Sequence, residues 1–288
     1  MKSMFENVLF FRRMHSVSIM IKLCIIVFVV GCGVNRFAEQ RSISHVVVVD
    51  SLRIGYRVDK ISYLPLERTF FLLNRDENTV RIYQNGVFFN MIGGVGFGDD
   101  NFRGLSDIAV GLDGHLYTLD RFDKSIKRFC KDGKFQGQVT LSGLASPERL
   151  AFGSSGTLLV YDGHAKEIYL LDAFTFSVNI SFGKFQVDRA DAFFVSGDRV
   201  NVFDRYNADT TIFFLTGMFD NSFRGLRFYD GHRNLLGVDE SGLFEVRTDR
   251  RLVEKRNDVG VLHFERDHFV MFDGVMVRVL RVRYETFL

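Results

Sequence analysis

The five residues Leu116-Tyr117-Thr118-Leu119-Asp120 form a short, mostly apolar run that ends in an acidic side chain. The same phrase, closed by Asp or Asn, recurs at residues 70–74, 158–162, 200–204, 235–239 and 269–273. Its closing residues stand at 74, 120, 162, 204, 239 and 273, so successive copies are 46, 42, 42, 35 and 34 residues apart. A period near forty residues, built from short strands, is typical of a β-propeller in which each repeat is one four-stranded sheet. Six copies therefore predict six blades.

Each copy lies within a longer unit whose parts keep the same order. An apolar run precedes the phrase, and a turn signal such as Asp113-Gly114 separates the two. A third run follows, and Asn85-Gly86 or Asp132-Gly133 then leads into a fourth. Glycine and aspartate accept the backbone conformations of tight hairpins, so each unit predicts one antiparallel blade of an all-β protein. Evenly spaced short strands would also suit a β-sandwich, but the longer period favours the propeller.

The last repeat is too short to complete its own blade. The chain after Asp273 has room for a third strand but hardly for a fourth. Residues 44–50 read as a strand that belongs to no complete repeat. An unpaired blade edge would expose a row of backbone hydrogen-bonding groups. We therefore predict that the N-terminal strand closes the sixth blade, and that residues 44–288 form one propeller domain.

The fullest unit, residues 101–135, shows a family pattern. Phe102 leads into it, Asp113-Gly114 follows the first strand, Asp120 ends the second, and Asp132-Gly133 follows the third. This arrangement resembles the NHL repeat. The resemblance covers roughly residues 60–288 and is strongest in the first three repeats. A proline usually precedes the first strand in that family, and here only Pro147 has that place.

The first forty residues differ in composition from the rest. Arg12, Arg13 and Lys22 precede an apolar run over residues 23–30, which ends in Val29-Val30-Gly31-Cys32. Positive charge, a short apolar core and then small residues are the layout of an export signal. The run is shorter than the roughly 20 apolar residues of a membrane-spanning helix.

The Val-Val-Gly-Cys ending resembles a bacterial lipobox. The resemblance implies that residues 1–31 are a removed signal peptide, that Cys32 carries a lipid, and that residues 32–43 are the lipidated Cys and a short tether. An uncleaved N-terminal anchor is the alternative. Both interpretations place the propeller in the cell envelope, on a membrane surface outside the cytoplasm. Gly33 stands where an Asp often retains lipoproteins at the inner membrane, so outer-membrane sorting is favoured.

Composition restricts the partners that we expect. The 37 basic and 35 acidic residues nearly cancel, and this balance does not indicate nucleic-acid binding. Cys130 would be left alone in the processed chain, which excludes a disulfide within it. We expect a monomer without a cofactor, held to the membrane by its lipid and bound to a protein of the envelope.

No catalytic or metal site is predicted. The sequence Asp-Gly-His occurs at 113–115, 162–164 and 230–232, but His115 and His232 precede second strands whereas His164 follows one. The Asp or Asn that ends each phrase is predicted to form turns, because these side chains accept hydrogen bonds from nearby backbone N–H groups.

Loops after the second strands should share one face with the loops between blades. We predict that this face carries the interaction site. The candidate residues are Arg75, Arg121 and Arg205, which directly follow the phrase, and Asp99, Asp100, Phe102 and Arg103, which precede the second blade.

Two functions remain open at this point. The first is a binding scaffold for a protein or another ligand. The second is a metal-dependent hydrolase or lyase with its site in the central channel, which would need inward-facing side chains such as Asp107, Glu148, Asp191 or His263.

Overall fold

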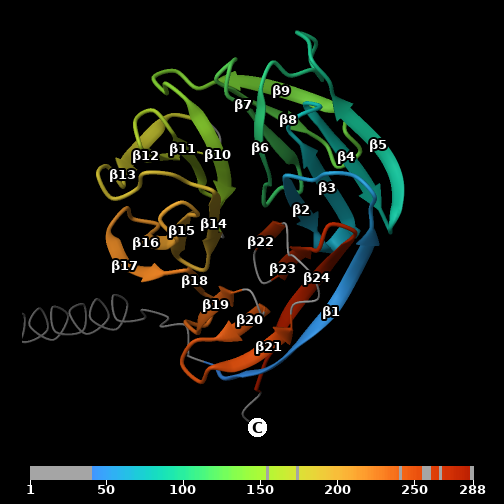
Figure 1. Cartoon of the computed structure of the whole chain (residues 1–288). Coiled ribbons are helices and arrows are strands. Elements are labelled where there is room, and N and C mark those ends of the chain that lie inside the picture. The colour runs from blue at the N-terminus through green and yellow to red at the C-terminus, as the bar shows by residue number, and fades with distance from the viewer. Residues whose placement is uncertain are drawn as a thin grey trace, which may run out of the picture. The chain divides into compact units, whose positions relative to one another are not determined.

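The computed structural model describes residues 41–153, 156–172, 175–239, 242–254, 261–265 and 268–285. These residues form six antiparallel four-stranded sheets arranged in a ring (Figure 1). The prediction of a six-bladed β-propeller is confirmed. The described part of the chain has no helix that is long and apolar enough to cross a membrane. Residues 1–31 and Cys32, on which the export predictions depend, lie outside the described residues.

In each of the first five blades, neighbouring strands follow one another along the chain. The first blade contains β2 (Lys60–Leu64), β3 (Thr69–Asn74), β4 (Thr79–Gln84) and β5 (Val87–Gly93), with the short 3-10 helix η1 (Pro65–Glu67) after β2. The second contains β6 (Leu105–Val110), β7 (Leu116–Asp120), β8 (Ser125–Phe129) and β9 (Phe135–Thr140). The third contains β10 (Pro147–Phe152), β11 (Leu158–Asp162), β12 (Glu167–Leu171) and β13 (Val178–Phe182).

The remaining blades complete the ring. The fourth contains β14 (Ala192–Ser196), β15 (Arg199–Asp204), β16 (Asp209–Phe214) and β17 (Phe219–Arg224). The fifth contains β18 (Leu226–Tyr229), β19 (Leu235–Asp239), β20 (Gly242–Glu245) and β21 (Arg250–Glu254). The sixth contains β22 (Val261–Glu265), β23 (His268–Phe272), β24 (Met276–Tyr284) and β1 (Ile43–Arg53).

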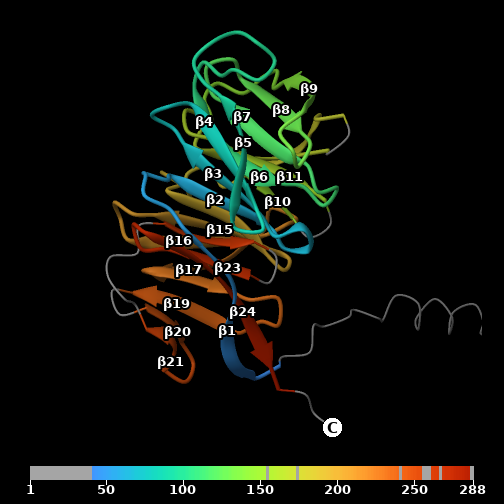
Figure 2. The same ribbon diagram turned by 90° about the vertical axis from the view of Figure 1, so that its right-hand side faces the viewer.

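The outer strand of the sixth blade comes from the other end of the chain. β1 pairs antiparallel with β24, and Val47 lies opposite Arg281. Both views show the two strands side by side (Figure 1 and Figure 2). Ile43 and Leu52 on β1 are buried, whereas Val48 is 58% exposed. One strand thus joins the beginning of the propeller to its end.

The apolar core is divided among the interfaces between neighbouring blades. Between the first and second blades, for example, Phe71 and Ile82 pack in one cluster with Phe102, Leu105 and Phe129. Large rings suit this position because they fill the wedge between two twisted sheets. Many of the described phenylalanines are therefore core residues, whereas others, such as Phe88 and Phe97, are exposed.

Asp50 on β1 makes a second connection, this time to the first blade. Its carboxylate accepts hydrogen bonds from Tyr63 Oη at 2.8 Å and from Arg68 Nη2 at 2.9 Å. Burial alone would raise the pKa of Asp50, but these hydrogen bonds hold the pKa below its ordinary value of 3.8. The charged carboxylate therefore stabilises the fold.

This lowered pKa predicts how stability depends on pH. A carboxylate whose pKa is lower in the folded state contributes fully above its ordinary pKa, and the contribution disappears as the pH falls through the folded-state pKa. We expect wild type to be more stable than Asp50→Asn by a constant amount above about pH 5, and the difference to shrink below about pH 4. Urea unfolding of both proteins across this range measures the difference. A difference that does not change with pH would contradict the role assigned to Asp50.

Candidate functional site

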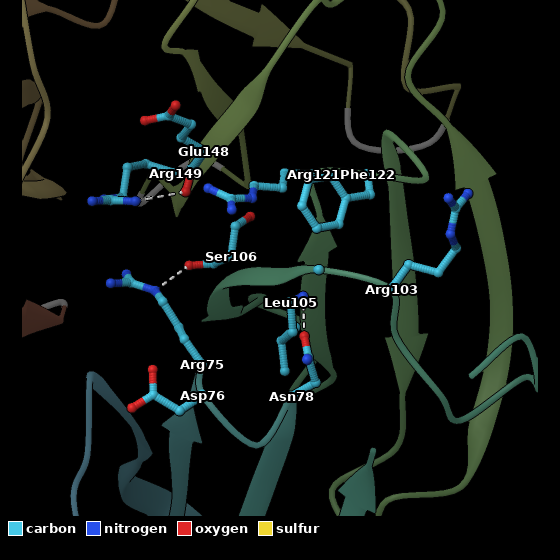
Figure 3. Close-up of a pocket in the computed structure, with 11 residues that line it drawn as sticks. Arg75, Asp76, Asn78, Arg103, Leu105, Ser106, Arg121, Phe122, Glu148 and Arg149 are labelled. Atoms are coloured by element: carbon cyan, nitrogen blue, oxygen red, sulfur yellow. Dashed lines mark hydrogen bonds between the residues drawn. The ribbon is translucent and has the colours of Figure 1, made fainter. Parts of the chain in front are cut away.

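A cavity of about 390 Å³ lies on the loop face of the first three blades. Its walls come from the loops that follow β3 and β7, from the segment that leads into β6, and from the start of β10. We call it the basic pocket. Its lining residues are Arg75, Asp76, Asn78, Arg103, Gly104, Leu105, Ser106, Arg121, Phe122, Glu148 and Arg149 (Figure 3).

The closing residue of each repeated phrase fixes the loops that build this face. Asp120 is fully buried, and its carboxylate accepts the N–H groups of Arg103 and Gly104 at 2.7 and 3.2 Å. It also accepts those of Phe122 and Asp123 at 3.0 and 3.1 Å. One carboxylate thereby joins the segment before β6 to the loop after β7.

The third blade repeats this arrangement. Asp162 accepts the N–H groups of Ala145 and Ser146 at 2.6 and 2.9 Å, and those of His164 and Ala165, both at 2.9 Å. The aspartates therefore form turns, as the sequence predicted, and they hold the walls of the pocket in place.

Two arginines reach the basic pocket from different blades. Arg75 Nε donates to the carbonyl of Ser106 at 2.7 Å, and Arg149 Nη1 donates to the carbonyl of Glu148 at 3.0 Å. Figure 3 shows both guanidinium groups extending in the same direction, with that of Arg121 reaching toward the same space. Arg149 Nε is buried and has no hydrogen-bond partner. Arg149 thus has one buried donor that is not satisfied within the described residues.

The charges in the pocket are unevenly compensated. Within the described ranges, no carboxylate lies within ion-pair distance of Arg75, Arg121 or Arg149. At the rim, by contrast, Arg103 pairs with Asp123 at 3.0 Å, and Asp76 pairs with Arg57. Burial lowers the pKa of Arg149, and the neighbouring charge of Arg75 lowers it further. The charges of Asp107, Glu148 and Asp191 act in the opposite direction and partly offset these two effects on the pKa of Arg149.

A buried ion pair lies beside this cluster. Lys60 Nζ donates to Asp107 Oδ2 at 2.8 Å and to the carbonyl of Leu150 at 3.1 Å, and so joins three inner strands. Asp107 is fully buried and also accepts the N–H of Leu150 at 2.8 Å. Burial lowers the pKa of Lys60, whereas the adjacent Asp107 raises it. Lys60 and Asp107 thus form one ion pair, whereas Arg149 forms no ion pair among the described residues.

The three charged residues share one position in the repeat. Each lies on the first strand of its blade, opposite the residue of the second strand that comes just before the closing Asp or Asn of the phrase. The opposite residues are Leu73 for Lys60, Leu119 for Asp107 and Tyr161 for Arg149. The same position in the other blades holds Ala192, Leu226 and Val261. The charged inner-strand positions therefore occur in three consecutive blades, next to the basic pocket.

The structure brings together some of the predicted interaction residues. Arg75, Arg103 and Arg121 line the basic pocket. Arg205 follows β15 in the fourth blade and does not line it, and Asp99 and Asp100 are exposed in the loop between β5 and β6.

Phe102 requires a correction. It was predicted to belong to an interaction face but is completely buried, with its ring centroid 6.1 Å from that of Phe129. The residue that leads into the blade fills the wedge between two blades, and so it is not available at the surface.

Two of the residues proposed for a metal site already have other partners. Asp107 is already bonded to Lys60, and Asp191 accepts the N–H of Arg205 at 2.8 Å. Among the described residues, no group of three His, Cys, Asp or Glu side chains is placed to hold a metal ion. The side chain of His263 lies outside the description.

Comparison with known proteins supports the propeller fold but does not assign the chain to a family. No family model matches the sequence, and no curated protein matches it. Among solved structures, a catalytically inactive variant of virginiamycin B lyase from Staphylococcus aureus, solved with quinupristin, is similar, with a TM-score of 0.51. The two share 12% sequence identity over 79% of this chain and 82% of the other. The likeness shows a β-propeller. At this identity it transfers no activity.

Proposed function

We propose that this protein is an exported, lipid-anchored binding propeller of the cell envelope, distantly related to the NHL-repeat proteins. The basic pocket is the observation that supports a binding role. Its walls are fixed by buried aspartates, and two of its arginines, Arg75 and Arg149, are held by backbone carbonyls. Such a site is built before any ligand arrives, which lowers the cost of binding.

Binding accounts for the pocket better than catalysis does. A hydrolase or lyase needs a nucleophile, a general base or a metal close to the reacting atoms. Apart from Glu148 and the ion-paired Asp76, the ionisable groups that line the pocket are guanidinium groups, which stay protonated and therefore do not exchange protons as acid–base catalysts do. Stoichiometric zinc or calcium in the purified protein would contradict a purely binding role.

The lipid anchor is tested by changing one cysteine. We expect wild type to incorporate labelled fatty acid and to sediment with membranes, and Cys32→Ser to lose the label and appear in the soluble fraction. A buried acyl chain contributes about 0.8 kcal/mol per methylene group, and without it the proposed tether has little affinity for a membrane.

A matched control separates this effect from a general loss of cysteine. Cys130 is a free cysteine within the propeller, so Cys130→Ser should stay labelled and membrane-bound. A Cys32→Ser protein that remains in the membrane would support the uncleaved anchor instead. Unlabelled wild type in the cytosol would contradict the envelope location.

A further inference from the structure

We infer that the basic pocket binds an oxyanion, a carboxylate or phosphate group of a small ligand, between Arg75 and Arg149, with Arg121 approaching from the rim. The inference rests on the proposed binding function and names its ligand class. Three observations lead to it: the charge balance of the pocket, the unused donors, and the fixed positions of the arginines.

The charge balance favours an anion. Arg75, Arg121 and Arg149 have no carboxylate partner among the described residues, and Glu148 is the only lining carboxylate that is likewise without an ion pair. Charges at a partly buried site are screened less than charges in open water. Three guanidinium groups around one carboxylate thus leave a net positive pocket that an anion would neutralise.

The unused donors fit an oxyanion in particular. A guanidinium group carries five N–H bonds in a planar fork, which matches two oxygens of a carboxylate or phosphate. Only Nε of Arg75 and Nη1 of Arg149 donate within the described structure. Arg149 Nε is buried without a partner, which is a costly arrangement in a stable fold. The donors that an oxyanion in the cavity would meet are the two Nη groups of Arg75 and Nη2 of Arg149, which make no hydrogen bond within the described residues.

The arginines are held in position before a ligand binds. The carbonyl of Ser106 fixes Arg75 and that of Glu148 fixes Arg149, while Asp120 and Asp162 hold the loops on either side. The cavity of about 390 Å³ falls within the range of small-molecule sites. We therefore expect the ligand to be a small anion or a small molecule that carries one.

The test is a titration of the purified full-length chain in detergent. Inorganic phosphate and succinate are the two probes, and sodium chloride keeps the ionic strength constant. Wild type should bind at least one probe saturably, and the comparison of the two shows whether phosphate or carboxylate is preferred. Arg75→Gln and Arg149→Gln should each weaken binding by at least about tenfold, because each removes charge-assisted hydrogen bonds.

Two control variants make the result specific. Arg205→Gln removes an arginine from the same repeat position in the fourth blade, outside the pocket, and should bind like wild type. Glu148→Gln removes the lone unpaired carboxylate and should strengthen binding. Weaker binding after loss of a pocket arginine, together with stronger binding after loss of Glu148, is expected only if an anion binds in this pocket.

Folding of the variants is checked by thermal unfolding without ligand. Arg149→Gln removes a buried charge and should melt at or above the wild-type temperature. If Arg75→Gln unfolds, the more exposed Arg121→Gln replaces it and should also weaken binding.

The inference is overturned if neither anion binds saturably, or if Arg205→Gln weakens binding as much as the pocket variants do. If the protein instead binds a neutral solute such as glucose saturably and responds to neither anion, the proposed binding function stands. In that case only the assignment of an oxyanion as the ligand is overturned. Because purified protein is used, the result is independent of the membrane location tested with Cys32.

Discussion

Asp107→Ala should lower the free energy of unfolding by about 3–5 kcal/mol, the range measured when one partner of a buried ion pair is removed. Asp107 is fully buried, and it binds both Lys60 Nζ and the N–H of Leu150. Its loss leaves a buried ammonium group with only the carbonyl of Leu150 as acceptor. Urea unfolding followed by circular dichroism measures the change.

The double variant Lys60→Met with Asp107→Leu separates charge from packing. It removes both charges together and fills their volume with apolar atoms, a replacement that is often neutral in buried pairs. The N–H and carbonyl of Leu150 lose their side-chain partners, so we expect a cost of about 1–3 kcal/mol. A double variant as unstable as Asp107→Ala would show that the unpaired ammonium group is not the cause.

Deleting residues 43–53 should destabilise the whole ring and not only its terminus. The deletion removes β1, leaves β24 with an unpaired edge, and breaks the bonds from Asp50 to Tyr63 and Arg68. The first and sixth blades would then lose their shared strand. Hydrogen exchange should increase even in β10–β13, the blade opposite the sixth in the ring.

Point substitutions on the same strand provide the matched comparison. Ile43→Ala with Leu52→Ala removes buried side chains, each worth about 2–5 kcal/mol in a core. Val48→Ala with Val49→Ala removes exposed ones and should cost far less. Faster exchange confined to β24 after the deletion would contradict a closing role for β1.

The fold was predictable because its signal is repeated. Six phrases with turn residues at fixed offsets indicate blades even where one copy is weak, as in residues 235–239. The aspartates were predicted to form turns, and Asp120 and Asp162 each bind four backbone N–H groups. The periodicity of the sequence and the local chemistry of its turn residues were sufficient to predict the blades and the turns.

The basic pocket was only partly predictable. Arg75 and Arg121 were found because they follow the repeated phrase, whereas Arg149 was missed because it lies within an inner strand. Which side chains meet there depends on pairing across three blades, as in the bonds from Lys60 to Asp107 and Leu150. Aligning the inner strands would have revealed Lys60, Asp107 and Arg149 as charged residues at one position. Phe102 was misassigned because the same residue type suits an exposed loop and a wedge between blades.

The most direct test of anion binding in the basic pocket is a crystal structure of the protein soaked in selenate, an oxyanion with an anomalous signal. We expect an anomalous peak in the basic pocket, with oxygens within hydrogen-bond distance of Arg75 and Arg149. A pocket without a peak, in a crystal where selenate binds exposed arginines such as Arg205, would contradict it.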